Sequence, residues 1–223
     1  MRAILISLVA CATLAACAVP DPEVDAQVEL GDFRLKSNIA VTKTARKMGV
    51  SRDATEAEWE EVLEAAIEDR FRRYSGETPY TISYSLDGYL LATKGGRLAL
   101  ANRSALLATV HIWETDPLER LEDRSTQLFV LESLDGKTAI GSGIFRTKEE
   151  QMARLAASFA KAVERWLVAN GDLFGRDVSE ADIEAAAQDS AAQLAQAAAG
   201  AETGAPAPDT AGPTRPIQRP SEG

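Results

Sequence analysis

The chain has 223 residues, a formal net charge of −10 at pH 7 and 45% hydrophobic residues. This length suits one domain with extensions, and the excess of acid argues against nucleic-acid binding, because phosphates must be neutralised by Lys and Arg. With one histidine and two cysteines, the sequence has little material for a zinc site or a disulfide framework, so we predict no metal and no cofactor.

The first sixteen residues have the pattern of a secretory signal peptide: Arg2, a short apolar run, and small residues before Cys17. The run is shorter than the ~20 apolar residues that a membrane-spanning helix needs. Residues 14–17, Leu-Ala-Ala-Cys, resemble the bacterial lipobox. That motif directs diacylglyceryl attachment to the cysteine thiol, cleavage before the cysteine and acylation of the new amine. An ordinary signal peptide is the alternative interpretation.

Acyl chains such as palmitate on Cys17 would hold the mature protein at a membrane, because each buried CH₂ contributes about 0.8 kcal/mol. We therefore expect a protein of the cell envelope that faces the periplasm. Ala18 follows the cysteine, where an aspartate would act as a retention signal. By resemblance to enteric lipoproteins, this favours the outer membrane over the inner membrane. Cys11 lies in the removed segment, which excludes cysteine catalysis in the mature chain.

The first elements of the domain follow a short linker. Residues 17–32 are polar and contain proline, so we expect a lipidated tether to a domain that spans 33–176. The apolar positions in 33–43 predict a first strand. A capping box of Thr55 and Glu58 opens a helix. Its apolar face has helical spacing and consists of Trp59, Leu63, Ala66, Ile67, Phe71 and Tyr74.

A period-two pattern predicts a strand from Tyr80 to Thr93. Asp87-Gly88 within it could be a hairpin turn or a bulge, and we favour the bulge because the apolar signal continues after it. The glycines of residues 94–96 are the expected reversal. Further strands are predicted at 104–114, 125–133 and 138–145, with a turn at Asp135-Gly136 between the last two.

A second capping box, Thr147 with Glu150, opens a helix that we expect to stop at Gly171. The tail, residues 177–223, is alanine-rich and acidic. Its residues 179–199 could form a weak polar helix, whereas the segment from Thr203 should be disordered. The predicted fold class is α+β: two helices packed on a mostly antiparallel sheet of four to five strands, between a lipidated tether and a largely disordered tail.

No catalytic motif is recognisable, and we predict that the protein is not an enzyme. Ser142 lies directly between two glycines, which is not the G-x-S-x-G spacing of a nucleophile elbow. The sole histidine, His111, could act as a general base. A half-buried position in a sheet, or one at a partner surface, is the simpler interpretation. We predict a partner surface formed by Tyr84, His111 and Trp113, with core positions as the alternative for the aromatic residues.

Residues 141–152 read Gly-Ser-Gly-Ile-Phe-Arg-Thr-Lys-Glu-Glu-Gln-Met and run on into Leu155-Ala156 and Trp166-Leu167. This stretch resembles a group of small uncharacterised lipoproteins of alphaproteobacteria, and the similarity covers roughly 33–174. More distantly, the element order is similar to that of the lipopolysaccharide-assembly lipoprotein and the auxiliary lipoproteins of lipid-transporting ABC systems. The resemblance implies an envelope role and carries over no catalytic residue.

Three functions agree with these observations. The favoured one is a non-enzymatic envelope accessory, a tethered module that binds a protein, glycan or lipid component during assembly or transport. The second is a structural lipoprotein whose tail contacts other envelope layers. The third is an unrecognised hydrolase centred on His111. The lipidation motif and the lack of catalytic residues favour the accessory.

Overall fold

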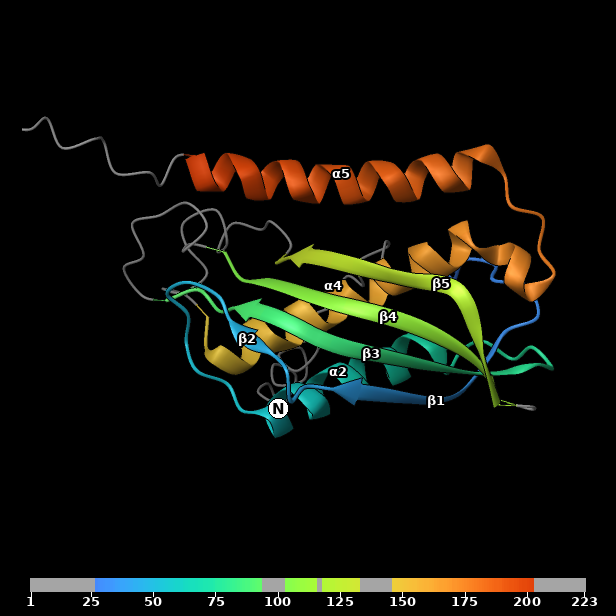
Figure 1. Cartoon of the computed structure of the whole chain (residues 1–223), viewed down its shortest axis with the longest axis horizontal. Helices are drawn as coiled ribbons and strands as arrows, with labels where there is room; N and C mark the ends of the chain where they lie inside the picture. Colours follow the sequence, from blue (N-terminus) through green and yellow to red (C-terminus); the bar gives the residue numbers. More distant parts are fainter. Residues whose placement is uncertain (1–26, 94–102, 116–117, 133–145, 203–223) are drawn as a thin grey trace, which may run out of the picture.

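The computed structural model describes residues 27–93, 103–115, 118–132 and 146–202 (Figure 1). The predictions for the signal peptide, Cys17, residues 94–96, the turn at Asp135-Gly136 and the strand 138–145 lie outside these residues. The described elements are β1 (Arg34–Val41), β2 (Arg46–Lys47), α2 (Glu56–Phe71), β3 (Pro79–Leu90), β4 (Ala105–Thr115), β5 (Leu118–Leu131), α4 (Lys148–Ala169), the 3₁₀ turn η2 (Gly171–Phe174) and α5 (Glu180–Glu202).

The strands form one sheet in the order β1-β3-β4-β5, and β2 pairs with β3 beyond the end of β1. β3, β4 and β5 are antiparallel neighbours, whereas β1 and β2 run parallel to β3. A parallel pair needs a crossover connection, and helix α2 supplies it between β2 and β3. The predicted α+β class with a mostly antiparallel sheet is therefore confirmed.

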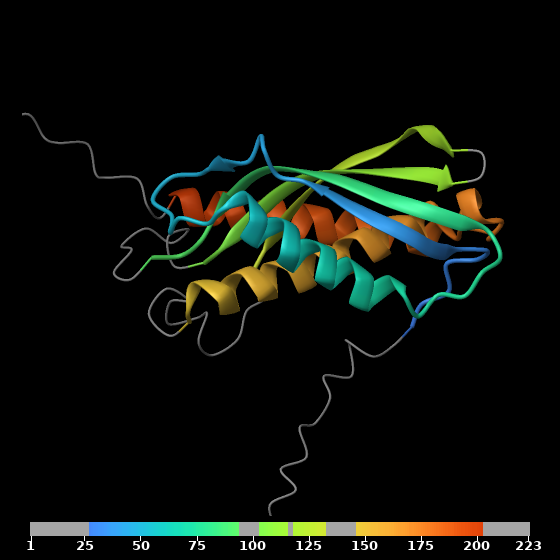
Figure 2. The same ribbon diagram turned by 90° about the horizontal axis from the view of Figure 1, so that it is seen from below.

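Helices α2 and α4 lie side by side on the same face of the sheet (Figure 2). The predicted apolar face of α2 is buried, and Trp59, Leu63, Ile67 and Phe71 are each at most 1% exposed. Phe33 lies at the centre of an aromatic group, with ring centroids 5.2–6.0 Å from those of Phe71, Tyr74, Tyr80 and Phe174. Burial of this apolar surface is the main force that holds the two layers together.

Several local predictions are confirmed in detail. Both capping boxes form, at Thr55 with Glu58 and at Thr147 with Glu150. The pairing of β3 with β4 shifts register between Leu86 and Gly88, as expected for a bulge. β5 starts at Leu118 rather than at 125, because pairing with β4 resumes after a second register shift and extends to Thr115.

Helix α4 ends at Ala169, and the glycine predicted as its stop has a different role. A Cβ on Gly171 would come within 2.5 Å of Arg176 Nε, so the glycine leaves room for that guanidinium. Arg176 in turn donates to the carbonyl oxygen of Val168 near the end of the helix. The left-handed residue in this turn is Gly175, with φ of +69°.

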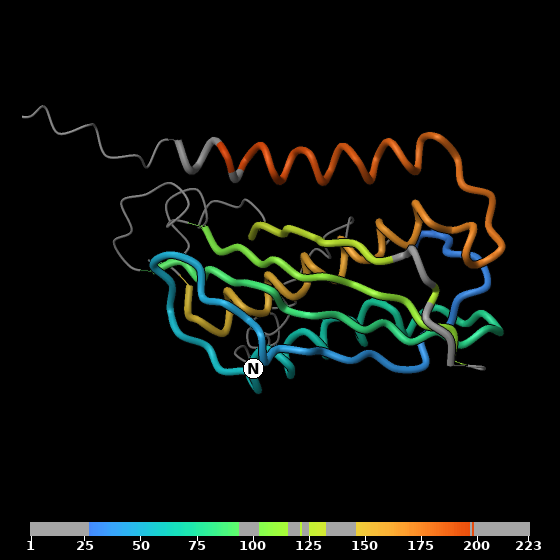
Figure 3. Tube along the Cα trace, in the orientation of Figure 1, coloured from blue at the N-terminus to red at the C-terminus, as the bar shows by residue number. Residues whose placement is uncertain are grey.

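The weak helix expected within the tail is present as α5. It runs alongside β5, although the two are far apart in the sequence (Figure 3). Ser179 and Asp182 exchange side-chain to backbone hydrogen bonds at its start. The segment predicted to be disordered from Thr203 lies outside the described residues. Within the described part of the chain, no helix is long and apolar enough to cross a membrane.

Helices α2 and α4 also meet at their first turns, where Lys148 donates to a carboxylate oxygen of Glu58. This hydrogen bond, with those from the backbone N–H and hydroxyl of Thr55, lowers the pKa of Glu58 from 4.5 to about 2. Because the pKa is lowered in the folded state, Glu58 stabilises the fold above pH 4.5, and this contribution is lost as the pH falls toward 2.

We expect Lys148→Ala to raise the pKa of Glu58 toward its ordinary value, because the hydrogen bond from Lys148, the largest cause of the lowered pKa, is removed. An NMR titration of the Glu58 carboxyl carbon measures this directly. Lys161→Ala on the same helix is the control and should leave that titration unchanged. An unchanged titration in Lys148→Ala would contradict the contact.

Candidate functional site

The candidate site is the face of the sheet opposite α2 and α4, which Figure 1 shows in front of both helices. Alternate strand residues point to opposite faces, so the neighbours of buried core residues belong to this second face. In β4, Val110 and Ile112 are fully buried against the helices, and His111 and Trp113 alternate with them. We call this surface the open face and define it by Ile39, Val41, Ser83, Ser85, Thr109, His111 and Trp113.

Side-chain hydrogen bonds connect neighbouring strands across the open face. Trp113 Nε1 donates to Ser83 Oγ over 2.7 Å, which fixes the indole ring against β3. Farther along the strands, Asp87 accepts from Thr109 Oγ1 at 2.6 Å and from Gln127 Nε2 at 3.1 Å. These contacts hold an indole, two hydroxyl groups, an amide and the Asp87 carboxylate in fixed positions on the sheet.

The β1 margin of the open face is apolar and accessible. Ile39 and Val41 are 49% and 45% exposed, in a protein whose other large apolar strand residues are mostly buried. Behind them, the backbone N–H of Ala40 donates to Glu64 Oε1 of α2 over 3.3 Å. A side chain therefore satisfies part of the outer edge of β1, which is one way in which proteins protect an edge strand.

A register shift explains why these aliphatic residues are exposed. Leu35 pairs with Tyr80 and packs against the core, but the pairing slips between Leu35 and Ser37. After the slip, Ile39 and Val41 align with Ser83 and Ser85 on the open face. A one-residue slip moves every later side chain to the other face of a sheet. The alternating pattern alone therefore gave no signal for this apolar margin.

The predicted partner surface is divided between the two faces of the sheet. His111 and Trp113 lie on the open face and are partly exposed. Tyr84 is 1% exposed, and its ring packs 5.3 Å from that of Phe159 in the core. Its hydroxyl donates to Asn38 Oδ1 over 2.8 Å, and burial raises its pKa. The period-two pattern contained this information, because Tyr84 has the parity of Ile82 and Leu86.

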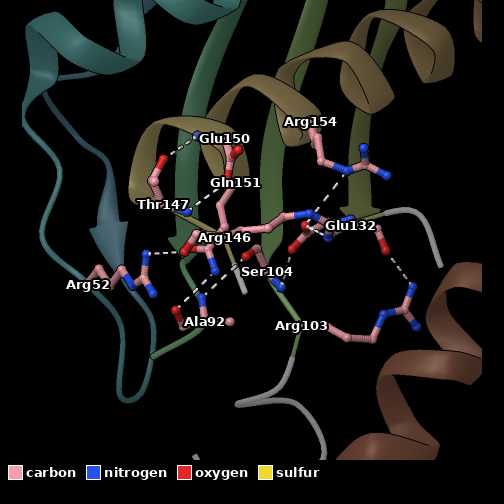
Figure 4. Close-up of polar contacts among 10 residues, drawn as sticks. All are labelled: Arg52, Ala92, Arg103, Ser104, Glu132, Arg146, Thr147, Glu150, Gln151 and Arg154. Atoms are coloured by element: carbon pink, nitrogen blue, oxygen red, sulfur yellow. Dashed lines mark hydrogen bonds and ion pairs between the residues drawn. The ribbon is translucent and has the colours of Figure 1, made fainter. Parts of the chain in front are cut away.

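A second polar cluster lies at one end of the sheet (Figure 4), and four of its residues are at most 6% exposed: Ser104, Glu132, Arg146 and Gln151. Arg146 donates to a carboxylate oxygen of Glu132, and the two side chains are 4% and 0% exposed. Arg103 Nη2 donates to the carbonyl oxygen of Glu132 over 2.8 Å, and Gln151 Nε2 donates to that of Ala92 over 3.1 Å. The cluster joins the ends of β3 and β5 to the starts of β4 and α4.

The open face carries one histidine, His111, among hydroxyl-bearing and apolar side chains. In the described part of the chain, no group of three or more His, Cys, Asp or Glu residues could hold a metal ion. His111 pairs in register with Ser83 on one side and Ser125 on the other. Ser83 Oγ, however, already accepts the Trp113 hydrogen bond. The arrangement provides a sheet surface of apolar, aromatic and hydrogen-bonding groups.

No protein-family model matches the chain, and no curated protein matches it in sequence. Solved structures with some similarity include two lipoproteins. One is a candidate lipoprotein from Caulobacter crescentus, with 15% identity and a TM-score of 0.33 over 60% of this chain and 92% of that one. The other is a minor lipoprotein from Acinetobacter baumannii, with 10% identity and a TM-score of 0.25 over 57% and 92%.

A third structure is the hypothetical protein CT253 from Chlamydia trachomatis. Its identity is 10% and its TM-score 0.33, over 60% of this chain and 99% of that one. At these identities and TM-scores, the function of this protein has to be argued from its own residues.

Proposed function

We propose that this protein is a lipid-anchored, periplasm-facing accessory of the bacterial cell envelope, which binds another envelope protein through the open face. The lipobox at residues 14–17 supports the anchor on Cys17, and Ala18 favours the outer membrane. Leu30 is the first described residue of the core, so about a dozen residues would separate it from Cys17 and keep the domain close to the lipid surface. Anchoring by two or three acyl chains needs no membrane-spanning helix.

The open face is the observation that carries the binding role. Its exposed margin of Ile39 and Val41 adjoins an immobilised tryptophan, and this margin consists of uncharged residues. The carboxylate of Asp87, to which Thr109 and Gln127 donate, lies farther along the strands. The centres of protein–protein interfaces are likewise depleted in charged residues and enriched in aromatic ones. A surface of this composition fits a protein partner with a complementary apolar patch.

We also propose that the protein is not an enzyme. A hydrolase needs an unengaged nucleophile beside its base and preorganised donors for the developing oxyanion. Ser83, the residue across from His111, already accepts a hydrogen bond from Trp113. His111 lies inside a strand that pairs with β3 throughout this region and with β5 up to His111, where the register shifts. These features support contact as the role of this face.

The binding role can be tested with a photo-crosslinking amino acid at position 41 in cells. The matched control carries the same amino acid at position 183 on α5, since Val41 and Ile183 are 45% and 54% exposed. We expect a discrete protein adduct from position 41 and none of the same mass from position 183. Cys17→Ser should weaken the position 41 adduct, because the anchor is lost. Failure of position 41 to form a discrete adduct would overturn the proposal.

A further inference from the structure

Helix α5 is attached to the domain in an unusual way. None of its described side chains is buried, and it contributes no residue to the hydrophobic core. Its largest apolar residues, Ile183 and Leu194, are 54% and 58% exposed. A helix in a globular domain normally directs its apolar stripe toward the core. Burial of apolar surface therefore contributes little to the attachment of α5.

Ion pairs and hydrogen bonds attach α5 to the domain instead, and we call this set of polar contacts the seam. Its inward residues recur at helical spacing and include Asp182, Asp189 and Gln193. Asp189 pairs with Arg165 of α4 over 2.6 Å, and Asp182 pairs with Arg176 over 3.0 Å. All four side chains of these two ion pairs are 17–34% exposed. Partly exposed ion pairs are weak and are screened by salt.

One hydrogen bond of the seam resembles the bond that a neighbouring strand would make to β5. Gln193 Oε1 accepts from the backbone N–H of Leu131 over 3.3 Å, near the end of β5. In the described residues, β5 pairs with another strand only on its β4 side. The side chain of α5 thus takes a position that a strand carbonyl would occupy in a continued sheet.

An apolar pocket of about 220 Å³ lies beneath α5. Leu107 and Phe129 line it from the sheet, Trp166 lines it from α4, and Leu194 lines it from α5. Leu107 and Phe129 are partners in register, and Leu107 has the same parity as Thr109 and His111. They therefore form the apolar continuation of the open face toward β5, and α5 covers it.

We propose that α5 is a displaceable strap, which covers the Leu107–Phe129 end of the open face when closed and adds that end to the binding surface when open. Opening of the polar seam withdraws no residue of α5 from the core, because none of its described side chains is buried. It would expose the residues that line the pocket, Leu107 and Phe129 among them. Helix α5 has 23 residues, which exceeds the length of about 12–15 residues below which isolated alanine-rich helices are marginal, so the released segment can remain partly helical. The role of the strap as a regulator rests on the proposed binding function, but its opening is a property of the isolated protein.

Hydrogen exchange of the purified full chain tests the opening without any partner. We expect the amides of α5 to exchange at least about 100-fold faster than those around Phe159 in α4, because local openings that expose little apolar surface are the cheapest. Arg165→Met should accelerate α5 exchange a further ~2- to 5-fold, since it removes one seam ion pair and leaves the sequence of α5 unchanged. Arg72→Met is the matched control, because Arg72 pairs with Asp69 on α2.

Thiol reactivity tests what the strap covers. In a chain with Cys11→Ser and Cys17→Ser, a Leu107→Cys thiol should alkylate faster when Arg165→Met is added, by the same factor as the exchange of α5. A Thr109→Cys thiol on the same strand face does not line the pocket and should not respond. Exchange of α5 as slow as that of α4, or equal responses at positions 107 and 109, would overturn the strap. Fast α5 exchange without a crosslink at position 41 would instead overturn the binding function alone.

Discussion

Glu164→Ala is expected to lower the free energy of unfolding by about 3–5 kcal/mol, the usual cost of removing one partner from a buried ion pair. Glu164 lies on α4, and its side chain is 2% exposed. It accepts from Arg70 Nε at 3.0 Å, from Arg73 Nη2 at 2.6 Å and from the Tyr74 hydroxyl at 2.6 Å. Without the carboxylate, two guanidinium groups and a hydroxyl at the α2–α4 contact lose their acceptor.

Urea unfolding measures the loss, and Asp69→Ala provides the control. Asp69 also pairs with an arginine of the same region, but its side chain is 69% exposed, so its removal should change the free energy of unfolding by less than about 1 kcal/mol. If the two substitutions lowered the free energy of unfolding equally, the stabilising contact of Glu164 between α2 and α4 would be contradicted.

The same carboxylate gives the stability a pH dependence. Burial alone raises the pKa of Glu164, but hydrogen bonds from Arg70, Tyr74 and Arg73 outweigh it and place the pKa below 4.5. Because the pKa is lowered in the folded state, the stabilisation is complete above pH 4.5 and disappears as the pH falls through the lowered value. When the pH is lowered below 5, Glu164→Gln should therefore lose less free energy of unfolding than the wild type does.

The pair of Glu132 and Arg146 is expected to show the second large effect. Glu132→Ala should cost about 3–5 kcal/mol, because Arg146 would keep a charge in a site where its side chain is 4% exposed. The double variant Glu132→Leu with Arg146→Met should lose less than the sum of the two single variants, because it removes both charges of the coupled pair together. Unfolding in urea of the wild type and three variants completes this cycle.

Additive losses in that cycle would contradict the coupling between Glu132 and Arg146. The expected coupling also bears on the arrangement of the domain, since the cluster joins four strand and helix ends at one end of the sheet. A variant that unfolds locally there should increase hydrogen exchange at Ala92 and Ser104 before it affects α2.

Sequence patterns within single elements were sufficient to predict much of the fold. The capping boxes located the starts of α2 and α4 because they depend on residues three positions apart. Helical spacing identified the core face of α2, and period-two spacing predicted the strand β3, since these patterns lie within single elements. The bulge at Asp87-Gly88 was likewise predictable, because the apolar pattern continues on both sides of it.

Features that depend on pairing between distant elements could not be predicted in the same way. The slip between Leu35 and Ser37 exists only in the register of β1 with β3, so the exposure of Ile39 and Val41 had no local signal. Glu164 and its partner Arg70 are separated by 94 residues. The same separation lies between Arg52 and Arg146, whose carbonyl oxygen accepts a hydrogen bond from the Arg52 guanidinium. The polar attachment of α5 was hidden for a similar reason, because the residues it contacts lie on α4 and β5.

Tyr84 shows a different limit of prediction from sequence, which concerns the face of the strand on which a residue lies. Its alternation with Ser83 and Ser85 already placed it with the core residues of β3, whereas the partner-surface prediction grouped it with His111 and Trp113 by residue type. Burial of its ring against Phe159 corrects that grouping. Residue type suggested the chemistry of a surface, but strand parity decided which residues share it.

The most direct test of the binding role compares the position 41 crosslink between two aspartate variants. Ile39→Asp places a charge beside the crosslinker on the open face, and Ile183→Asp places the same charge on α5, where the original residue is similarly exposed. We predict that Ile39→Asp reduces the adduct at least tenfold, since an unpaired carboxylate would be desolvated at the contact, whereas Ile183→Asp leaves it unchanged. An adduct of undiminished yield in Ile39→Asp would contradict the open face as the binding surface.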